Sequence, residues 1–579
     1  MTLNPADTFV ALLQRRAADC PDRVGYTFLI DGETIESSMT YGELHRHARA
    51  VAASIPPRED EPRRALLLYP PGLDYIVGLF GCLYAGAVAV PVYPPHPARL
   101  TRALPRLRAV ARDVQPTTVL TTTALIGLRA ALADDLPTTG WIATDATPAA
   151  LADQWRDPGV DGRSLAVIQY TSGSTGSPRG VMLDHRHLME NSAVIQDAAG
   201  HTPASVGVIW LPPYHDMGLV GGILQPLYAG FPVVLLSPLH FLQQPLRWLK
   251  AISHHRGTIG AGPNFAYELC VRKTTPAQRE ALDLRSWEVA FVGAEPIRAD
   301  TLEDFARAFA PCGFRREALY PCYGLAEATL MVTGGDKHGV VSLPSVVEMP
   351  SPGASDAPRL VACGRARGSH RIEIADPVTR VPLADGETGE IWVSGPSVAR
   401  GYWRQPEATA AAFEACTIMG EGPFLRTGDL GFLKDGNLFV NGRLKDVIVI
   451  RGRNHYPHDI ERDIDRCHPC LEPGGSAVFG VPLEGHEALV VVQEVPGRCR
   501  DPHWPAVEEA MRQTVLRSHG IAVTAIIPVA PATIPKTTSG KIQRDACRQK
   551  YLEGTLSPLF PRVLFRDAER RHVPSSPPG

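Results

Sequence analysis

At the centre of this chain stands the stretch Gln169-Tyr170-Thr171-Ser172-Gly173-Ser174-Thr175-Gly176-Ser177-Pro178-Arg179-Gly180-Val181-Met182. It follows Leu165-Ala166-Val167-Ile168, a run of strand-forming residues, and it is dense in small residues and hydroxyl groups. Glycines let a backbone approach an anion closely, and amide N–H groups with Ser and Thr hydroxyls can then surround phosphate oxygens. The loop Thr171–Gly176 is therefore a candidate phosphate-binding loop, with an ordinary Gly/Ser surface loop as the alternative. It is not a Walker loop, because Ser177 and Pro178 stand where that motif requires Lys and Ser or Thr.

Strands and helices alternate before this stretch. Val24–Ile30 and Ala65–Tyr69 read as strands, and Thr40 with Glu43 forms a capping-box pattern at the start of a helix between them. Strands separated by helices predict parallel sheets that are covered by helices on both faces. The predicted fold class is therefore α/β.

After the loop, several predicted strands end in polar or glycine-rich segments. Val206–Leu211 leads into 212–218, and two further strand-to-loop transitions lie at 258–265 and 289–296. Open α/β sheets bind ligands at the carboxyl ends of their strands. These segments are therefore candidate walls of a binding site.

The second half of the chain predicts a change of architecture. The helix and strand alternation stops over 332–363, where four prolines mark an irregular segment, and Glu390–Gly395 and Asn437–Val440 then predict a β-barrel-like subdomain. We expect a large first domain over 1–441, a hinge at 442–446, a small α+β domain over 447–555 and a loose tail over 556–579.

Composition excludes several classes of protein. The net charge of −3, from 58 basic and 61 acidic residues, gives no electrostatic case for nucleic acid as a partner. The span Tyr75–Pro97 has no charged residue, but its glycines and prolines favour a buried helix from about Leu73 to Ala85 over a membrane segment. The eleven cysteines indicate reduced thiols in a cytoplasmic protein, and the pair Cys467 and Cys470 is not interpreted as a zinc or redox site.

Several motifs along the chain together resemble the adenylate-forming superfamily of acyl-CoA synthetases, luciferases and peptide-synthetase adenylation domains. They are Thr171–Gly176, Gly293-Ala294-Glu295, Tyr323-Gly324-Leu325-Ala326-Glu327, Arg426-Thr427-Gly428-Asp429, Gly442-Arg443-Leu444-Lys445-Asp446 and Pro535-Lys536-Thr537-Thr538-Ser539-Gly540-Lys541. Within this superfamily the chain looks most like the fatty-acyl-AMP ligases, on stretches that include Leu67–Tyr75, Tyr84–Pro95, Tyr214–Leu219, Ala261–Ala266 and Arg453–Pro457. Such enzymes activate a fatty acid with ATP and pass the acyl group to the phosphopantetheine thiol of an acyl carrier protein.

The resemblance implies a role for each motif. The loop with residues Thr171, Ser172, Gly173, Ser174, Thr175 and Gly176 would hold the phosphates, with Arg179 where many relatives have Lys. Glu327 would bind Mg²⁺, and Gly293, Ala294, Glu295, Tyr323, Gly324, Asp429 and Arg443 would surround the adenine and ribose. His215 would position the acyl carboxylate, and Met217, Leu219, Ile223, Asn264 and Phe265 would line the acyl pocket. Lys541 would stabilise the transition state after closure of the small domain about Lys445 and Asp446.

Alternatives remain at this point. Coenzyme A could replace the carrier protein as the acyl acceptor, because the segment 332–363 is shorter than the insertion usual in fatty-acyl-AMP ligases. A non-catalytic nucleotide-binding homologue is a second alternative, although Glu327, Asp429, Arg443 and Lys541 are all present. A P-loop kinase is a third alternative, but the chain lacks the Lys followed by Ser or Thr that ends the P-loop motif.

Overall fold

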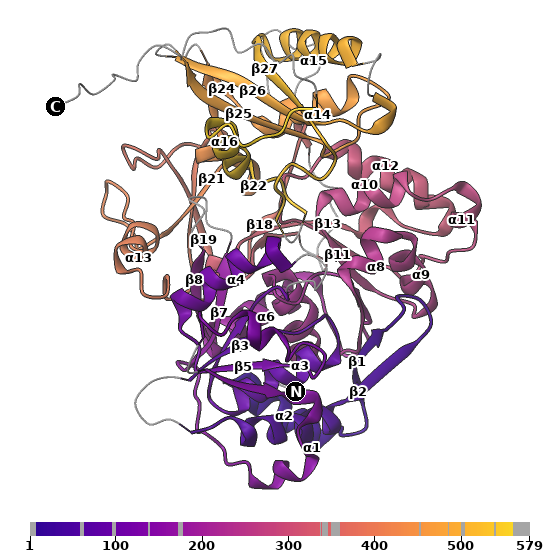
Figure 1. Ribbon diagram of the computed structural model, residues 1–579, viewed down its shortest axis with the longest axis vertical. Coiled ribbons are helices and arrows are strands. Elements are labelled where there is room, and N and C mark those ends of the chain that lie inside the picture. Colours follow the sequence, from indigo (N-terminus) through magenta and orange to yellow (C-terminus); the bar gives the residue numbers. More distant parts are fainter. Residues whose placement is uncertain are drawn as a thin grey trace, which may run out of the picture. The chain divides into compact units, whose positions relative to one another are not determined.

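The computed structural model describes residues 7–57, 63–94, 100–136, 139–171, 178–335, 337, 346–348, 359–450, 453–483, 486–499, 504–537 and 540–559. These residues divide into two compact units, with the described residues up to 444 in the first and those from 445 in the second (Figure 1). The division falls within 442–446, where the hinge is expected, and movement about it stays a prediction.

The first sheet of the first unit carries the central stretch. Its order is β6 (Gly140–Ala143), β5 (Thr118–Thr121), β3 (Arg64–Leu67), β4 (Val88–Pro91), β7 (Leu165–Thr171) and β8 (Arg179–Asp184). All neighbours are parallel except β7 and β8. Along and just beyond β3, Ala65 and Leu67 belong to one apolar core while Leu66 and Leu68 belong to another. Because alternate side chains of a strand point to opposite faces, this sheet is buried on both.

The second sheet repeats the same plan. Its order is β13 (Leu319–Pro321), β12 (Val289–Val292), β11 (Ile259–Gly262), β9 (Gly207–Ile209), β10 (Val233–Leu236), β1 (Val24–Leu29) and β2 (Glu36–Thr40). Only the edge pair of β1 and β2 is antiparallel. The predicted α/β class is confirmed.

Two of the predicted helices are confirmed close to their expected bounds. α2 (Tyr41–Ser54) begins with the capping box of Thr40 and Glu43, and α3 (Leu73–Tyr84) lies in the uncharged span. A Cβ on Gly81 of α3 would lie 2.4 Å from the side chain of Val51 in α2, so the glycine allows the two helices to pack closely. None of the described helices is long and apolar enough to cross a bilayer.

The first unit contains further helices. They are α1 (Phe9–Asp19), α4 (Leu100–Val114), α5 (Leu128–Ala131), α6 (His185–Ala199), α7 (Gln225–Ala229), α8 (Pro238–Gln243), α9 (Leu246–His254), α10 (Asn264–Arg272), α11 (Pro276–Glu280), α12 (Ala299–Phe309) and the π-helix η4 (Met217–Leu224). Leu107 and Val110 of α4 pack against the face of the first sheet that carries Leu66 and Leu68.

Short antiparallel sheets complete the first unit. They are β14 (Tyr323–Gly324), β15 (Met331–Gly334) and β18 (Arg365–Ala366); β16 (Val346–Glu348) and β17 (Arg359–Val361); and β19 (Arg371–Ala375), β20 (Gly389–Ser394), β21 (Leu425–Lys434) and β22 (Asn437–Arg443). The segment 332–363 is thus not wholly irregular, because it contains β16 and β17. The backbone N–H of Cys363 donates to Leu438 in β22, which joins the chain before β18 to the four-stranded sheet. α13 (Pro406–Phe413) lies between β20 and β21 in the sequence.

The second unit is a small α+β fold. β25 (Ser476–Leu483), β26 (His486–Glu494) and β27 (Val523–Val529) form its sheet, and β23 (Ile448–Ile450) with β24 (Arg453–His455) forms a hairpin. Apolar residues of α14 (Pro457–Arg466) and α15 (Trp504–His519) belong to one core of this unit, and Cys547 of α16 (Arg544–Leu552) belongs to another. Pro558 pairs with Val529, so ordered chain reaches into the first residues of the expected tail.

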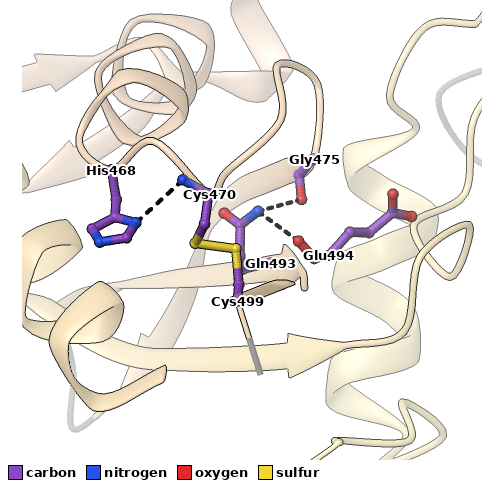
Figure 2. The surroundings of a disulfide bond; sticks show 6 residues. All are labelled: His468, Cys470, Gly475, Gln493, Glu494 and Cys499. Atoms are coloured by element: carbon purple, nitrogen blue, oxygen red, sulfur yellow. Dashed lines mark hydrogen bonds between the residues drawn. A yellow bond between two sulfur atoms is a disulfide. The ribbon is translucent and has the colours of Figure 1, made fainter. Parts of the chain in front are cut away.

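A disulfide joins Cys470, which follows α14, to Cys499, which follows β26 (Figure 2). Beside it, the Gln493 amide donates to the backbone carbonyls of Gly475 and Glu494. The expectation that the cysteines are reduced thiols is wrong at this pair. The sequence missed it because the partner of Cys470 is 29 residues away and not the nearby Cys467, which is free.

Candidate active site

The glycine-rich loop connects two antiparallel strands. β7 ends at Thr171 and β8 begins at Arg179, and the register pairs these two residues directly. Residues 172–177, which include Ser172–Gly176 of the expected phosphate loop, lie outside the described residues. Both ends of the loop therefore meet at one point of the sheet edge, with the Arg179 guanidinium beside it.

A segment far along the chain extends the sheet next to β8. Tyr402 forms an antiparallel bridge with Val181, the N–H of Met182 donates to the carbonyl of Gly401, and the N–H of Trp403 donates to the carbonyl of Gly180. This pairing brings the Tyr402 side chain to Arg179, whose guanidinium lies 5.2 Å from the centre of the Tyr402 ring. Tyr402 was not among the residues selected from the sequence.

Glu327, the expected Mg²⁺ ligand, is the next side chain in this group. It lies in the short 3-10 helix η7 (Ala326–Ala328), and the Tyr402 hydroxyl donates to its Oε1 over 3.0 Å. Burial raises the pKa of the Glu327 carboxyl, and the hydrogen bond from Tyr402 opposes that rise. Burial and the neighbouring Glu327 raise the pKa of Tyr402, so its hydroxyl keeps the proton that it donates.

A buried polar cluster fixes the loop that carries Glu327. Asn191 of α6 donates to the carbonyls of Ala328 and Met331 and to the hydroxyl of Ser397. Thr329 has a backbone φ of +73°, a strained value for a β-branched residue, and its hydroxyl donates to the Ser397 carbonyl over 2.7 Å. Backbone strain of this kind persists only where the surroundings impose it, and it is typical of functional sites. Nothing in the local sequence indicated this cluster.

The residues expected to hold the ribose lie together. Asp429 in β21 stands opposite Arg443 in β22, and the Arg443 Nε donates to its Oδ1 over 3.1 Å. The Tyr323 hydroxyl donates to Asp429 Oδ2 over 2.8 Å. Tyr323 is thus anchored by Asp429, a contact that the sequence did not predict.

The glycines of the expected adenine site have close backbone neighbours. A Cβ on Gly324 would lie 1.6 Å from the carbonyl oxygen of Leu330, so no larger residue fits, even without a nucleotide. A Cβ on Gly293 would approach the carbonyl of Cys322 to 3.1 Å. Ala294, which follows Gly293, has a φ of +67°.

Glu295 and Asn264, taken from the sequence as site residues, make structural hydrogen bonds. Glu295 Oε1 accepts from the backbone N–H of Phe265 at the start of α10. The Asn264 side chain is 1% exposed; its oxygen accepts from the N–H of Arg298 and its amide donates to the Thr301 hydroxyl. These contacts hold α10 against the start of α12.

The expected acyl pocket is distributed over η4 and α10. Leu219 and Ile223 of η4 are core residues, whereas Met217 and Phe265 are partly exposed. π-helices are rare and are often found at functional sites. Trp210, which no sequence pattern indicated, stacks its ring on Phe241, and the ring centre lies 6.2 Å from that of Phe265. Its buried Nε1 has no hydrogen-bond partner among the described residues.

His215 precedes η4. Its Nδ1 lies 2.5 Å from Asp216 Oδ1, which also accepts from the backbone N–H of Met217. Burial is the main cause of the raised pKa of Glu327, and Asp216 adds to that rise.

The remaining predicted residues belong to the second unit. Lys541 lies in a tight turn in which the Thr537 N–H donates to its carbonyl and its own N–H returns to the Thr537 hydroxyl. The expected hinge residues are held by α16: Lys445 pairs with Asp545 over 2.7 Å and Asp446 with Arg544 over 3.2 Å.

One group of side chains that could together hold a metal ion occurs among the described residues, apart from the Glu327 site. Glu36 at the start of β2 and His254 and His255 at the end of α9 have ligand atoms within 4.8 Å of one another. Two of the three side chains are exposed, and none belongs to the site described above.

The fold and these residues define an adenylate-forming enzyme. Residues 13–403 match the family model described as AMP-binding enzyme, and 445–559 match the AMP domain of Disco-interacting protein 2-like proteins. The chain belongs to the AMP-binding enzyme family.

Its relatives are more specific. The chain is 46% identical over 573 residues to the medium-chain-fatty-acid–[acyl-carrier-protein] ligase JamA of Moorena producens, covering 96% of this chain and 97% of the relative. It is 35% identical over 604 residues to a ligase of the same description, TtuA of Teredinibacter turnerae, with coverages of 94% and 93%. The fatty acyl-adenylate ligase of Legionella pneumophila, solved with acyl adenylate and pyrophosphate, superposes with a TM-score of 0.73 at 37% identity over 96% of this chain and 97% of that one. The resemblance to fatty-acyl-AMP ligases is thereby confirmed.

Proposed function

We propose that this chain activates a medium-chain fatty acid with ATP to the acyl adenylate and then transfers the acyl group to the phosphopantetheine thiol of an acyl carrier protein. The observation that carries this proposal is the convergence of Arg179, Tyr402 and Glu327 at the mouth of the β7–β8 loop. At the end of a glycine-rich loop, a cationic group can bind the phosphates of a nucleoside triphosphate, and a carboxylate can bind the metal ion that accompanies them. The names of the two relatives support the medium chain length and the carrier protein.

The first half-reaction joins two anions. A carboxylate oxygen of the fatty acid attacks the α-phosphorus of ATP, the bond from that phosphorus to the bridging oxygen breaks, and pyrophosphate leaves with the electron pair. The enzyme must therefore supply positive charge and hold the reactants in line. We assign Arg179 and the loop Thr171–Gly176 to the phosphates, Asp429 and Arg443 to the ribose, and His215 to the acyl carboxylate.

The residues present fit a magnesium ion. Mg²⁺ prefers oxygen ligands and binds through one or two carboxylates together with substrate phosphates, and Glu327 offers a carboxylate whose Oε1 accepts from Tyr402. Magnesium would neutralise charge on the phosphates. Glu327 would hold it, and Tyr402 would orient Glu327.

The second half-reaction exchanges oxygen for sulfur. The carrier-protein thiolate attacks the acyl carbonyl, a thioester forms and AMP leaves. Coenzyme A carries the same thiol and is the alternative acceptor. Since ATP and acyl carrier proteins are found in the cytoplasm, we assign the enzyme to that compartment, where the disulfide of Cys470 and Cys499 is an exception to the usual reduced state of cysteines.

A panel of fatty acids with ATP and Mg²⁺ tests the first step. We expect acyl-AMP, detected by mass spectrometry, with a maximum among medium chain lengths. Absence of acyl-AMP and of acid-dependent ATP–pyrophosphate exchange with every acid would overturn the proposal. Offering holo-acyl carrier protein and coenzyme A in parallel tests the acceptor, and preferential formation of acyl-CoA would contradict our choice.

A further inference from the structure

Tyr402 connects two groups that come from distant parts of the chain. Its hydroxyl donates to Glu327 Oε1 over 3.0 Å, and its ring lies under the Arg179 guanidinium at 5.2 Å. Glu327 lies 75 residues away in sequence from Tyr402. A single side chain therefore contacts both the carboxylate and the cation that flank the phosphate loop.

The backbone of Tyr402 is fixed independently of these contacts. Its bridge to Val181 attaches it to β8, and its N–H donates to the Thr409 hydroxyl over 2.9 Å. The preceding Gly401 has a φ of +132°, and a Cβ there would lie 2.2 Å from the Thr409 side chain. This close approach lets Thr409 reach the Tyr402 N–H.

The ring of Tyr402 is fixed as well. The residue is 6% exposed, and the Phe413 ring of α13 meets it edge-on with centres 5.1 Å apart. The backbone of Tyr402, the edge of its ring and the face of its ring are each in contact with a neighbouring group, so the ring has one available orientation. The hydroxyl therefore points to Glu327 without further ordering of the side chain. This is the pre-organisation that a positioning group requires.

We propose that Tyr402 is a positioning residue for acyl-adenylate formation, with its hydroxyl orienting the Glu327 carboxylate toward a phosphate-bound divalent cation and its ring aligning Arg179 beside the same phosphates. The proposal rests on the function assigned above. It predicts that the hydroxyl acts through Glu327 and not by stabilising the fold.

Tyr402→Phe separates these roles. Phenylalanine keeps the packing on Phe413 and the ring face under Arg179, and it removes the hydroxyl, which bonds to Glu327 and also interacts with the Arg179 side chain. The matched control is Tyr84→Phe, which removes the hydroxyl of another buried tyrosine together with its hydrogen bond to His45 Nδ1. Glu327→Gln keeps an oxygen that can accept from Tyr402 but removes the charge.

Binding is measured first, by calorimetric titration of ATP with and without Mg²⁺. We expect Mg²⁺ to increase the affinity of the wild type for ATP. In Tyr402→Phe this increase should be smaller by a factor of about ten to a hundred, as expected for the loss of a hydrogen bond to a charged group. Mg²⁺-free ATP binding and the melting temperature should change no more than in Tyr84→Phe. If Tyr402→Phe keeps the full Mg²⁺-dependent gain, the proposal is wrong.

Kinetics then tests whether the effect passes through Glu327. Tyr402→Phe should lower kcat for acyl-AMP formation and raise the Mg²⁺ concentration needed, with the KM for the fatty acid unchanged. In the Glu327→Gln background the same change should have little additional effect, because coupled residues are non-additive. Equal losses in both backgrounds would contradict the assignment. Should the wild type form no acyl-AMP, the assigned function fails, while the ATP titrations still decide the role of Tyr402.

Discussion

At the scale of single residues, Gly324 shows how close packing determines residue choice at the site. Its missing Cβ leaves room for the Leu330 carbonyl, which would otherwise lie 1.6 Å from the side chain. The neighbouring Tyr323 holds Asp429, so a shift at Gly324 would also move the groups assigned to the ribose.

We therefore expect Gly324→Ala to lower the free energy of unfolding by about 2–4 kcal/mol, because a backbone carbonyl cannot retreat without moving β15. Differential scanning calorimetry measures this change, and ATP titration should show weaker binding. Gly127→Ala is the control, since a Cβ there has no atom within 4 Å. Equal melting temperatures for the two variants would show that the contact is relieved without cost.

At the scale of elements, α6 and the short segment after it carry buried histidines that stay neutral. Burial lowers the pKa of His185 and His187 to about 4 and that of His201 to about 3. Each of these folded-state pKa values lies below the unfolded value of about 6.5. Below that pH the unfolded chain takes up protons that the folded chain does not, so stability falls as the pH falls.

We expect the free energy of unfolding to decrease between pH 6.5 and about pH 4, by about 1.4 kcal/mol per pH unit for each of these histidines. Denaturant unfolding at several pH values measures the slope. His201→Phe should make the slope shallower, and His254→Gln, at an exposed position, should leave it unchanged. If His201→Phe does not change the pH dependence of the free energy of unfolding, His201 is not a buried neutral side chain in the folded protein.

The second unit offers a test at the same scale. The disulfide of Cys470 and Cys499, drawn in Figure 2, links the segment after α14 to the segment after β26. Cross-linking a loop of 29 residues restricts the unfolded chain and stabilises the fold by about 3–4 kcal/mol in the chain-entropy model.

Replacing both residues by serine should lower the stability of the second unit by that amount, measured by thermal unfolding. A reducing agent should have the same effect on the wild type and none on the double variant. Cys467→Ser is the control that leaves the disulfide intact. Reaction of all eleven cysteines with a thiol reagent in denaturant, without reductant, would show that the bond is absent.

At the scale of the whole molecule, the proposed chemistry draws on both units. The groups assigned to ATP, namely Arg179, Glu327, Asp429 and Arg443, belong to the first unit, whereas Lys541 belongs to the second. Binding and chemistry should therefore be separable by mutation.

We expect Lys541→Ala to reduce acyl-AMP formation by about a hundredfold or more, as loss of a charge-stabilising donor does, with little change in ATP affinity. Mass spectrometry of the product and ATP calorimetry measure the two effects. Lys550→Ala on the exposed face of α16 serves as the control. Unchanged acyl-AMP formation in Lys541→Ala would remove Lys541 from the mechanism.

The sequence alone determined the features that depend on residues close together in the chain, namely helices, strands and local motifs. Periodicity and capping predicted α2 and α3, and runs of apolar residues between turn signals predicted strands in both sheets, among them β1, β3, β7 and β9. Motif order also predicted Glu327, Asp429 and Arg443 as site residues, and the structure places Asp429 and Arg443 in contact.

Only the tertiary structure decided which distant segments meet. The pairing of Tyr402 with β8, the anchoring of Tyr323 by Asp429, and the bond between Cys470 and Cys499 all join residues without any local signal. The role of Asn264 also depends on residues that are distant in sequence. Its side chain forms hydrogen bonds with Arg298 and Thr301 and so holds two helices together. Local patterns follow from the geometry of one helix or strand, whereas these contacts depend on strand register and on the closure of long loops, which short stretches of sequence do not encode.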